Sequence, residues 1–391
     1  MKKILYFFPD NIGLQTAGNK TRAIHLLKYF NERGYKVDFA SLKHETADQD
    51  TEQDTIDWIK SNKLADNIFL LPRKPGKGNP VTYFFRYKLW DLFYYWRTYP
   101  LKSNIPTFLT LKLKHSFEAI LKANRYDFIL ISYVQCAELI SNTKLVGNAK
   151  TIVDTHDFIT AQFKNKRRFN LGVTFEDEIN RLNLFNEIWA ISPEEQYIFN
   201  QFCKPAVKLI SLIVDEPVLE QKPFNERKYD LIYVASDNIH NINSAKWFFE
   251  KVYPLLPPGL NICVVGKINK YIPLEYNVER VVFAKKLDEY YNNAKVALCP
   301  MVTGTGVKVK VVEALAAGLP VVCSFRGIDG LPNKLHNGCL VSDDPTEFAS
   351  NIVTLLNDKI LYDIQARYAR ELFDNSFSKN VIFDALDKVF N

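Results

Sequence analysis

Residues 303–324 read TGTGVKVKVVEALAAGLPVVCS, and this stretch decides the fold class of the chain. It predicts a glycine-rich loop, a short helix, a glycine stop and a buried strand. Gly304 and Gly306 allow a ligand to approach the backbone closely. The helix that follows would point its free N–H groups and its positive dipole end at the loop. Such an arrangement attracts phosphate.

Three charged residues of the same stretch extend this prediction. Glu313 follows Lys310 by three residues, so the two side chains share a helix face. The carboxylate could accept both hydroxyls of a ribose while Lys310 or Lys308 meets a diphosphate. The alternative is a solvent-facing Lys310–Glu313 pair without a ligand. The flanking glycines favour a phosphate-and-ribose ligand, of which a sugar nucleotide is one kind.

The composition is that of a globular protein with more than one core. The chain has 391 residues, of which 47% are hydrophobic, and this suits two domains. The six cysteines are scattered without a Cys-x-x-Cys pair, so we expect reduced core residues in a cytoplasmic protein. No apolar run approaches the ~20 residues of a membrane span. The formal charge of +6 allows attraction to an anionic lipid surface but does not demand nucleic acid.

Alternating strand and helix patterns predict two α/β domains. Continuous apolar runs such as Ile4–Phe8 are typical of parallel strands buried on both faces. One series occupies residues 1–205 and a second occupies 206–375, while 376–391 reads as a terminal helix that could pack back on the first domain. We therefore expect two doubly wound, Rossmann-like domains facing a central cleft.

Residues 72–107 interrupt the first series. Prolines and glycines mark a loop, and residues 83–97, YFFRYKLWDLFYYWR, then interleave aromatic and basic side chains. One interpretation is a helix packed on the core. The others are a surface at a membrane interface and an acceptor-binding wall. The sequence leaves all three open.

A second glycine loop, Gly13–Arg22, follows the first predicted strand and precedes a helix, so its amides could form an anion site that includes Gly18. Arg22 and Lys20 lie in or near the first helical turn, where the helix dipole disfavours cations. A bound anion would explain them. The alternative is a plain connection.

Polar residues follow two further predicted strands, at the position where α/β sheets place ligands. His156 could bond a sugar hydroxyl, and Asp157 could orient that ligand, act as a base or cap a helix. A second polar cluster could line the cleft or cap a helix at Ser244: Ser236, Asp237, Asn238, His240, Asn241 and Asn243. No His-x-x-x-His spacing occurs, and lysines and helix ends could neutralise a diphosphate, so we expect no metal.

Together these motifs resemble those of GT-B glycosyltransferases, especially the bacterial retaining enzymes of family four. The strongest match is Pro300-x3-Gly304-Thr-Gly306-Val-Lys308-Val-Lys310-x2-Glu313, continuing to Gly318-x-Pro320. Supporting matches follow the family's order along nearly the whole chain: Gly18-x3-Arg22, Val153-Asp-Thr-His156-Asp157, Ile191-Ser192, Asn241-x5-Trp247-Phe248 and Tyr290-Tyr291-x2-Ala294.

The resemblance implies roles for these positions. Glu313 would bind the ribose, Lys308 and Lys310 would neutralise the diphosphate, and His156 would touch the donor sugar. The implied donor-binding residues are Gly18, Arg22, Ser236, Lys285, Gly304, Thr305, Gly306, Val307, Lys308 and Glu313; the implied catalytic residues are His156, Asp157 and Lys310. Two departures stand out. Thr305 occupies the place of a second glutamate, and the segment from Ser236 to Asn243 lacks the family's Arg and Lys, for which Lys285 and Lys308 could compensate.

The resemblance also implies a reaction. A sugar would pass from a nucleoside diphosphate sugar, with UDP or GDP expected, to a hydroxyl of a glycan or lipid-linked acceptor in bacterial surface polysaccharide synthesis. We expect retention of configuration, no metal or other cofactor, no nucleic acid partner, and a cytoplasmic place with peripheral contact to the inner membrane. If the reaction inverts, Asp157 or His156 would be the base. A sugar-nucleotide epimerase of the same architecture and a catalytically inactive scaffold protein remain open alternatives.

Overall fold

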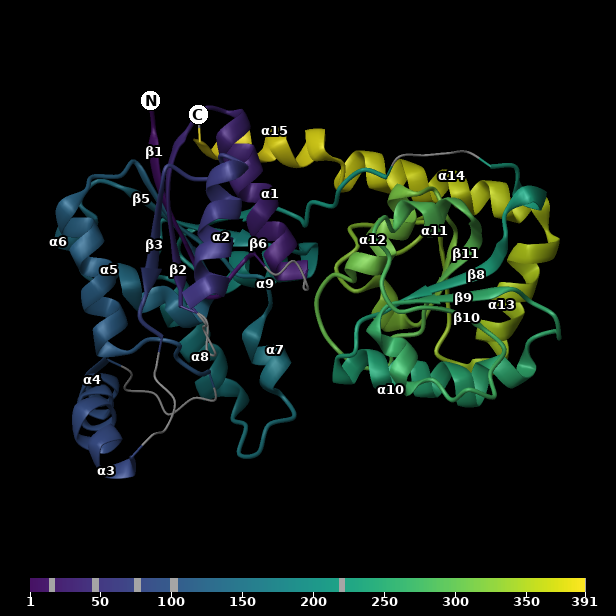
Figure 1. Ribbon diagram of the computed structural model, residues 1–391, viewed down its shortest axis with the longest axis horizontal. Coiled ribbons are helices and arrows are strands. Elements are labelled where there is room, and N and C mark those ends of the chain that lie inside the picture. The colour runs from purple at the N-terminus through teal and green to yellow at the C-terminus, as the bar shows by residue number, and fades with distance from the viewer. Residues whose placement is uncertain (14–17, 44–48, 74–78, 99–104, 218–221, 391) are drawn as a thin grey trace. The chain divides into compact units, whose positions relative to one another are not determined.

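The computed structural model describes residues 1–13, 18–43, 49–73, 79–98, 105–217 and 222–390. The chain divides into an amino-terminal unit, Met1–Leu209, and a carboxyl-terminal unit, Ile210–Asn391. Each unit contains one parallel sheet with helices packed on it (Figure 1). The predicted α/β class with two doubly wound domains is therefore confirmed.

Seven parallel strands form the amino-terminal sheet, in the order β3-β2-β1-β4-β5-β6-β7. Their bounds are β1 Lys3–Phe8, β2 Lys36–Leu42, β3 Asn67–Leu71, β4 Phe128–Ser132, β5 Lys150–Asp154, β6 Glu187–Ala190 and β7 Ala206–Leu209. The winding direction reverses between the neighbours β1 and β4. In sheets of this kind, ligands bind beyond the carboxyl ends of the strands at such a switch point, here after Phe8 and Ser132.

The end of the first sheet differs from the sequence prediction. The predicted boundary after residue 205 assigned β7 to the second series, but Val207 pairs with Ile188 of β6. Only one of the four β7 residues is buried. A strand this short and this exposed has no apolar run to identify it. The amino-terminal unit consequently extends to Leu209.

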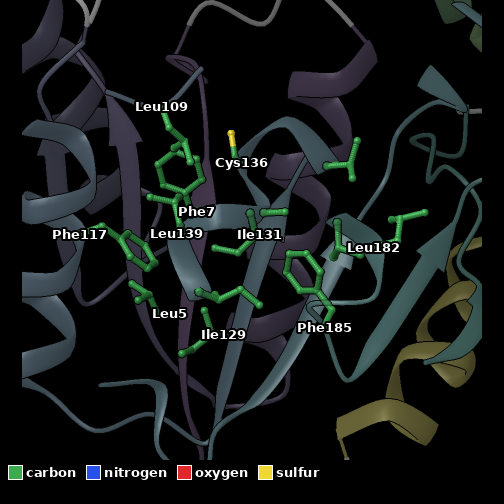
Figure 2. Close-up of a cluster of buried hydrophobic side chains, with 14 of the residues drawn as sticks. Leu5, Phe7, Leu109, Phe117, Ile129, Ile131, Cys136, Leu139, Leu182 and Phe185 are labelled. Atoms are coloured by element: carbon green, nitrogen blue, oxygen red, sulfur yellow. The ribbon is translucent and has the colours of Figure 1, made fainter. Parts of the chain in front are cut away.

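Helices cover the first sheet, and their buried faces form its core. Their bounds are α1 Gly18–Glu32, α2 Gln49–Ser61, α3 Pro80–Tyr83, α4 Leu89–Thr98, α5 Leu111–Ala123, α6 Thr143–Val146, α7 Ile159–Phe163, α8 Leu171–Leu182 and α9 Pro193–Phe202. Figure 2 shows the core beneath α5, where Phe7 of β1 meets Phe117 edge to face with ring centroids 5.9 Å apart. Ser192 begins α9, because its Oγ accepts the Glu195 N–H at 3.2 Å.

The interruption at residues 72–107 contains a helical segment on the surface of the amino-terminal unit. A π-helical turn, Phe84–Lys88, joins α3 to α4. None of the residues 79–94 and none of the described side chains beyond them in α4 is buried. The interpretation as a core helix is therefore wrong. Residues 74–78 and 99–104 of this segment lie outside the described residues.

Six parallel strands form the carboxyl-terminal sheet, in the order β10-β9-β8-β11-β12-β13. Their bounds are β8 Tyr229–Val234, β9 Ile262–Val265, β10 Glu279–Val281, β11 Ala294–Cys299, β12 Val321–Cys323 and β13 Cys339–Val341. The switch point lies between β8 and β11, which pair directly. The loops after Val234 and after Cys299 therefore flank the expected ligand position.

The helices of this unit are α10 Ile239–Trp247, α11 Asp288–Asn292, α12 Val309–Ala316, α13 Pro345–Asn357, α14 Lys359–Ser376 and α15 Lys379–Phe390. The prediction of a helix start at Ser244 is wrong. Asn238 begins α10 instead, because its Oδ1 accepts the Asn241 N–H at 2.9 Å. The predicted terminal helix corresponds to α15, and its packing against the first domain stays a prediction. Among the described residues, no helix has the length and apolar character needed to cross a bilayer.

Candidate functional site

The loop between β11 and α12 has a backbone that favours glycine. The φ angles of Gly304 and Gly306 are 100° and 72°, values that residues with a Cβ rarely adopt. A Cβ on Gly304 would also lie 3.5 Å from Cγ of His240. The two glycines thus let the chain pass close to the first turn of α10 and enter α12.

Lys308 supports this loop from inside. Its Nζ donates to the carbonyl oxygens of Gly306 at 2.6 Å and Thr305 at 3.2 Å, and it lies 3.8 Å from Oδ2 of Asp329. The side chain is buried. In this structure Lys308 stabilises the loop, and its predicted contact with a diphosphate stays a prediction.

Lys310 connects α12 to the first turn of α10. Its Nζ donates to Oδ1 of Asn241 at 2.7 Å and lies 5.5 Å from the ring centroid of Tyr233. Nδ2 of Asn241 in turn donates to Oγ of Ser236, in the loop after β8, at 3.0 Å. Burial lowers the pKa of Lys310, although the charges of Cys299 and Glu313 act in the opposite direction. Two segments on either side of the switch point are thereby joined through one ammonium group.

Glu313 has a different partner from Lys310. Its Oε2 accepts the hydroxyl of Tyr291, from α11, at 3.2 Å. Burial raises the pKa of Glu313 to about 7. The alternative of a solvent-facing Lys310–Glu313 ion pair is therefore wrong, since each side chain turns to another element. The carboxylate keeps its second oxygen, Oε1, for a further hydrogen-bond donor.

Three other predicted residues of this unit have simpler surroundings. Ser236 is exposed at the end of the loop after β8, and Val307 is half-buried next to Lys308. Lys285 is exposed in the segment after β10. A contact absent from the predictions joins the loop before α12 to the first turn of α10, because Nδ1 of His240 and Oγ1 of Thr303 lie 2.9 Å apart.

In the amino-terminal unit, Asp154 neutralises Arg22, beside which the sequence analysis expects a bound anion. The Nε of Arg22 donates to Oδ1 and Oδ2 of Asp154 at 3.1 and 2.9 Å, and Nη2 donates to Oδ1 at 2.8 Å. Both side chains are buried. Burial alone would raise the pKa of Asp154, but the charges of Arg22 and His156 hold it well below its usual range. Lys20 is likewise paired, at 3.2 Å, with Asp10. The anions expected beside both cations are supplied by the protein itself.

His156 is held on three sides at the end of β5. Its Nε2 lies 3.1 Å from Oδ2 of Asp154 and 3.3 Å from Oγ of Ser132, and its ring stacks on Tyr133 with centroids 4.3 Å apart. The φ angles of Tyr133 and His156 are 71° and 63°. Such values are strained for residues with side chains and concentrate at functional sites. Asn19, next to Gly18, donates to the Tyr133 hydroxyl at 2.7 Å, so this cluster reaches the start of α1.

Glu178, rather than Asp157, accepts hydrogen bonds from backbone N–H groups at the start of α7. Its Oε1 accepts the Ile159 N–H at 2.8 Å, and its Oε2 accepts the N–H and hydroxyl of Thr160 at 2.7 and 2.6 Å. The N-cap position of α7 is Phe158, so the alternative that Asp157 is the N-cap residue is wrong. The buried carboxyl of Glu195 has its pKa raised to about 8, first by burial and then by the charge of Asp157. Asp157 therefore lies near a second buried carboxyl group.

Sequence reasoning missed four residues of these sites: Ser132, Tyr133, Asp154 and Glu178. The first three follow or end the strands β4 and β5, and this position was the available signal. Glu178 lies within a helix and gave none. Within the described ranges, no three His, Cys, Asp or Glu side chains are grouped to hold a metal ion.

Comparisons with known proteins agree with this geometry. Residues 228–358 match the family described as Glycosyl transferases group 1. This span runs from the start of β8 to the end of α13 and includes Gly304–Glu313. An uncharacterized 44.6 kDa protein in the cps region of Klebsiella pneumoniae is 21% identical over 304 residues, which cover 69% of this chain and 74% of that protein.

Solved glycosyltransferase structures resemble the whole chain in fold. Sucrose-phosphate synthase from Thermosynechococcus elongatus has a TM-score of 0.72 at 15% identity, covering 100% of this chain and 98% of that one. HepE from Anabaena, in complex with UDP-glucose, has a TM-score of 0.69 at 14% identity, covering 100% and 99%. A mutant of TarM from S. aureus, in complex with fondaparinux, alpha-GlcNAc-glycerol and UDP, has a TM-score of 0.65 at 14% identity, covering 100% of both chains.

These findings confirm the resemblance to GT-B glycosyltransferases. The fold is GT-B, and residues 228–358 of the carboxyl-terminal unit match the glycosyl transferases group 1 family. The prediction of a glycosyltransferase enzyme is confirmed at this level.

Proposed function

We propose that this chain transfers a sugar from a nucleoside diphosphate sugar, with UDP or GDP as the nucleotide, to a hydroxyl of a glycan or lipid-linked acceptor. One observation carries the proposal. At the switch point of the carboxyl-terminal sheet, Lys310 meets an amide oxygen, a sulfur atom and an aromatic ring, and none of its contacts with the described residues is an ion pair. A half-buried ammonium beside the start of α12 that has no carboxylate in direct contact, and feels Glu313 only from further away, suits a diphosphate.

The remaining residues of α12 and its loop complete the proposed donor site. Glu313 would accept the ribose hydroxyls through its available oxygen, and Gly304–Gly306 would face the donor sugar. Lys308, Lys310 and the first N–H groups of α12 would stabilise the charge that develops on the leaving diphosphate. Such stabilisation acts where charge appears in the transition state and can account for a large part of catalysis.

We further propose a retaining, metal-independent reaction. The leaving phosphate would take the proton of the acceptor hydroxyl as the new glycosidic bond forms, so that no enzyme nucleophile is needed. His156 would contact the donor sugar, with Asp154 holding its ring. If the product is inverted, the base is Asp157 or His156.

The relatives favour UDP and a glycan acceptor in bacterial surface polysaccharide synthesis. HepE is described in complex with UDP-glucose, the TarM mutant with UDP and glycan-like ligands, and the Klebsiella relative in a cps region. We propose that the present chain acts in the cytoplasm, in peripheral contact with the membrane that would hold a lipid-linked acceptor.

A panel of nucleotide sugars tests the proposal. We expect one nucleoside diphosphate sugar to raise the unfolding temperature, because a ligand that binds only the folded chain stabilises it. The same donor should then be consumed with an added glycan or lipid-linked acceptor. No shift with UDP-, GDP-, ADP- or dTDP-sugars would contradict the donor proposal, and an epimer formed from donor alone would make the chain an epimerase.

Turnover measured in the presence of EDTA tests whether the reaction needs a metal ion. The chain contains one Asp-x-Asp sequence, Asp48-Gln49-Asp50, of which Asp48 lies outside the described residues. We expect turnover to survive EDTA. Loss of turnover in EDTA with recovery on adding Mn²⁺ or Mg²⁺ would show that a metal is needed.

A further inference from the structure

The helical segment Pro80–Thr98 is attached to the amino-terminal unit along one face. Four half-buried residues recur at helical spacing on that face: Tyr83, Tyr87, Asp91 and Tyr94. Oδ1 of Asp91 accepts the Leu111 N–H at the start of α5 at 3.2 Å, and Nζ of Lys114 lies 5.2 Å from the Tyr94 ring centroid. The segment therefore leans on α5, and Figure 1 shows α3 and α4 beyond one end of α5.

A different face of the same segment is apolar and exposed. Its members again recur at helical spacing: Val81, Phe85, Leu89, Leu92, Phe93 and Trp96. Their exposed fractions run from 42% for Leu89 to 78% for Trp96. Single exposed apolar residues are normal on protein surfaces, but a contiguous stripe of large ones marks an interaction site. We call this stripe the apolar face.

Basic groups accompany the apolar face. Arg86 and Lys88 are exposed on the segment itself. Beside it lies a cavity of about 520 Å³, whose lining includes Arg73, Arg86, Lys112 and His115. Asp91, the acidic residue among the lining residues that the structure describes, already accepts a backbone N–H. The surroundings of the apolar face are thus positively charged.

Charge decides what covers the apolar face. A second copy of the chain would bring Arg86 and Lys88 of both copies together, and like charges in an interface disfavour association. An anionic bilayer offers apolar tails for the stripe and phosphates for the basic groups. Tryptophan, which the stripe contains at Trp96, prefers the boundary between headgroups and acyl chains.

We propose that Pro80–Thr98 is a membrane-docking element. The segment lies in the headgroup region of an anionic phospholipid bilayer, with the apolar face inserted between lipids and the basic cavity facing their phosphates. The biological reason for membrane docking rests on the proposed function, because a lipid-linked acceptor would lie in the bilayer. The docking itself depends only on the segment and its basic neighbours.

Vesicle sedimentation tests the docking. The full chain is mixed with vesicles of phosphatidylcholine alone or with about one-third phosphatidylglycerol, at low and high salt. The first variant, Phe85→Ser with Trp96→Ser, shortens the apolar face. The second, Arg86→Gln with Lys88→Gln, removes charge. A matched control, Leu274→Ser with Phe325→Ser, changes equally exposed apolar residues of the other unit.

We expect the wild-type chain and the control to bind the anionic vesicles. The apolar variant should lose roughly tenfold or more in partition coefficient, because membrane affinity scales with the apolar area inserted. The charge variant should lose several-fold at low salt and less at high salt, where screening already weakens the attraction. Unfolding temperatures measured alongside show that each variant is folded.

Three outcomes overturn the proposal. The wild-type chain fails to bind anionic vesicles at low salt, or the apolar variant binds as well as the control, or light scattering shows a dimer that the apolar variant dissociates without any vesicle binding. Binding of the nucleotide sugar is measured on the same preparation without vesicles, and its result does not depend on membrane docking. Failure of the docking can thus be told apart from failure of the proposed transferase activity.

Discussion

The two units share a strand order at their switch points but treat their cations differently. In the amino-terminal unit, the guanidinium of Arg22 is held at two points by the buried carboxylate of Asp154. In the carboxyl-terminal unit, Lys310 meets Oδ1 of Asn241, which is neutral. The same topology therefore produces, in one unit, an arginine neutralised by a buried ion pair and, in the other, a lysine with no direct ion pair to any described residue. An anionic ligand gains more from the second.

The largest expected effect comes from removing the carboxylate that neutralises Arg22. Asp154→Asn leaves the guanidinium of Arg22 buried without its counter-charge, so we expect the free energy of unfolding to fall by about 3–5 kcal/mol. Trp189, buried in β6 and paired with Asp154 in the sheet register, reports the unfolding of this unit by fluorescence in urea.

The matched control is Asp374→Asn, which breaks an exposed pair with Arg370 and should cost about 0.5 kcal/mol or less. If Asp154→Asn lowers the free energy of unfolding by less than about 1 kcal/mol, Arg22 must find another partner. The claim that Asp154 neutralises Arg22 would then be disproved.

Glu313→Ala tests the second site. We expect affinity for the nucleotide sugar to fall roughly 10- to 100-fold, because hydrogen bonds to a charged group contribute about 1.5–3 kcal/mol. Calorimetric titration of the donor found in the panel measures this loss. Glu289→Ala, an exposed acid on α11, should leave the affinity unchanged. Equal affinities for both variants would remove Glu313 from the ribose role.

A smaller effect follows from the raised pKa of Glu313, about 7. If the ribose hydroxyls bind the ionised carboxylate, affinity should weaken about tenfold from pH 8 to pH 6, since roughly one carboxyl in ten is ionised one unit below its pKa. In the free protein, the free energy of unfolding depends on pH in the opposite direction. The stabilising contribution of Glu313 is present below the pKa that this carboxyl has in the unfolded chain, and it is lost as the pH rises through about 7. Glu313→Gln should flatten the binding profile, whereas a wild-type affinity that rises toward pH 6 would contradict the role.

The parts of the molecule that the sequence predicts well are those that depend on neighbouring residues. β1 is predicted to within one residue, because Ile4–Phe8 is a continuous run of buried side chains. The half-buried β13, Cys339–Val341, has no such run. Likewise the loop and helix over Gly304–Glu313 follow from local glycines and spacing.

The parts that could not be predicted join distant segments. Asn241 lies 69 residues before Lys310 in the chain, and Arg22 lies 132 residues before Asp154. Neither pairing has a local signal, since each depends on which strand ends meet at the switch point. The positive φ angles of Tyr133 and His156 are imposed by their packing on each other and also leave no trace in the sequence.

Lys310 makes no direct ion pair with the described residues, and a calorimetric titration tests whether it binds the diphosphate of the donor. The affinity of the nucleotide sugar is measured by calorimetry at low salt for the wild-type chain, for Lys310→Met, and for Lys295→Met, whose lysine is already paired with Asp230 at 2.8 Å. We expect a loss of roughly 10- to 100-fold for Lys310→Met, the size of a charge-assisted hydrogen bond, and no change for Lys295→Met. Wild-type affinity in Lys310→Met would show that Lys310 does not bind the diphosphate.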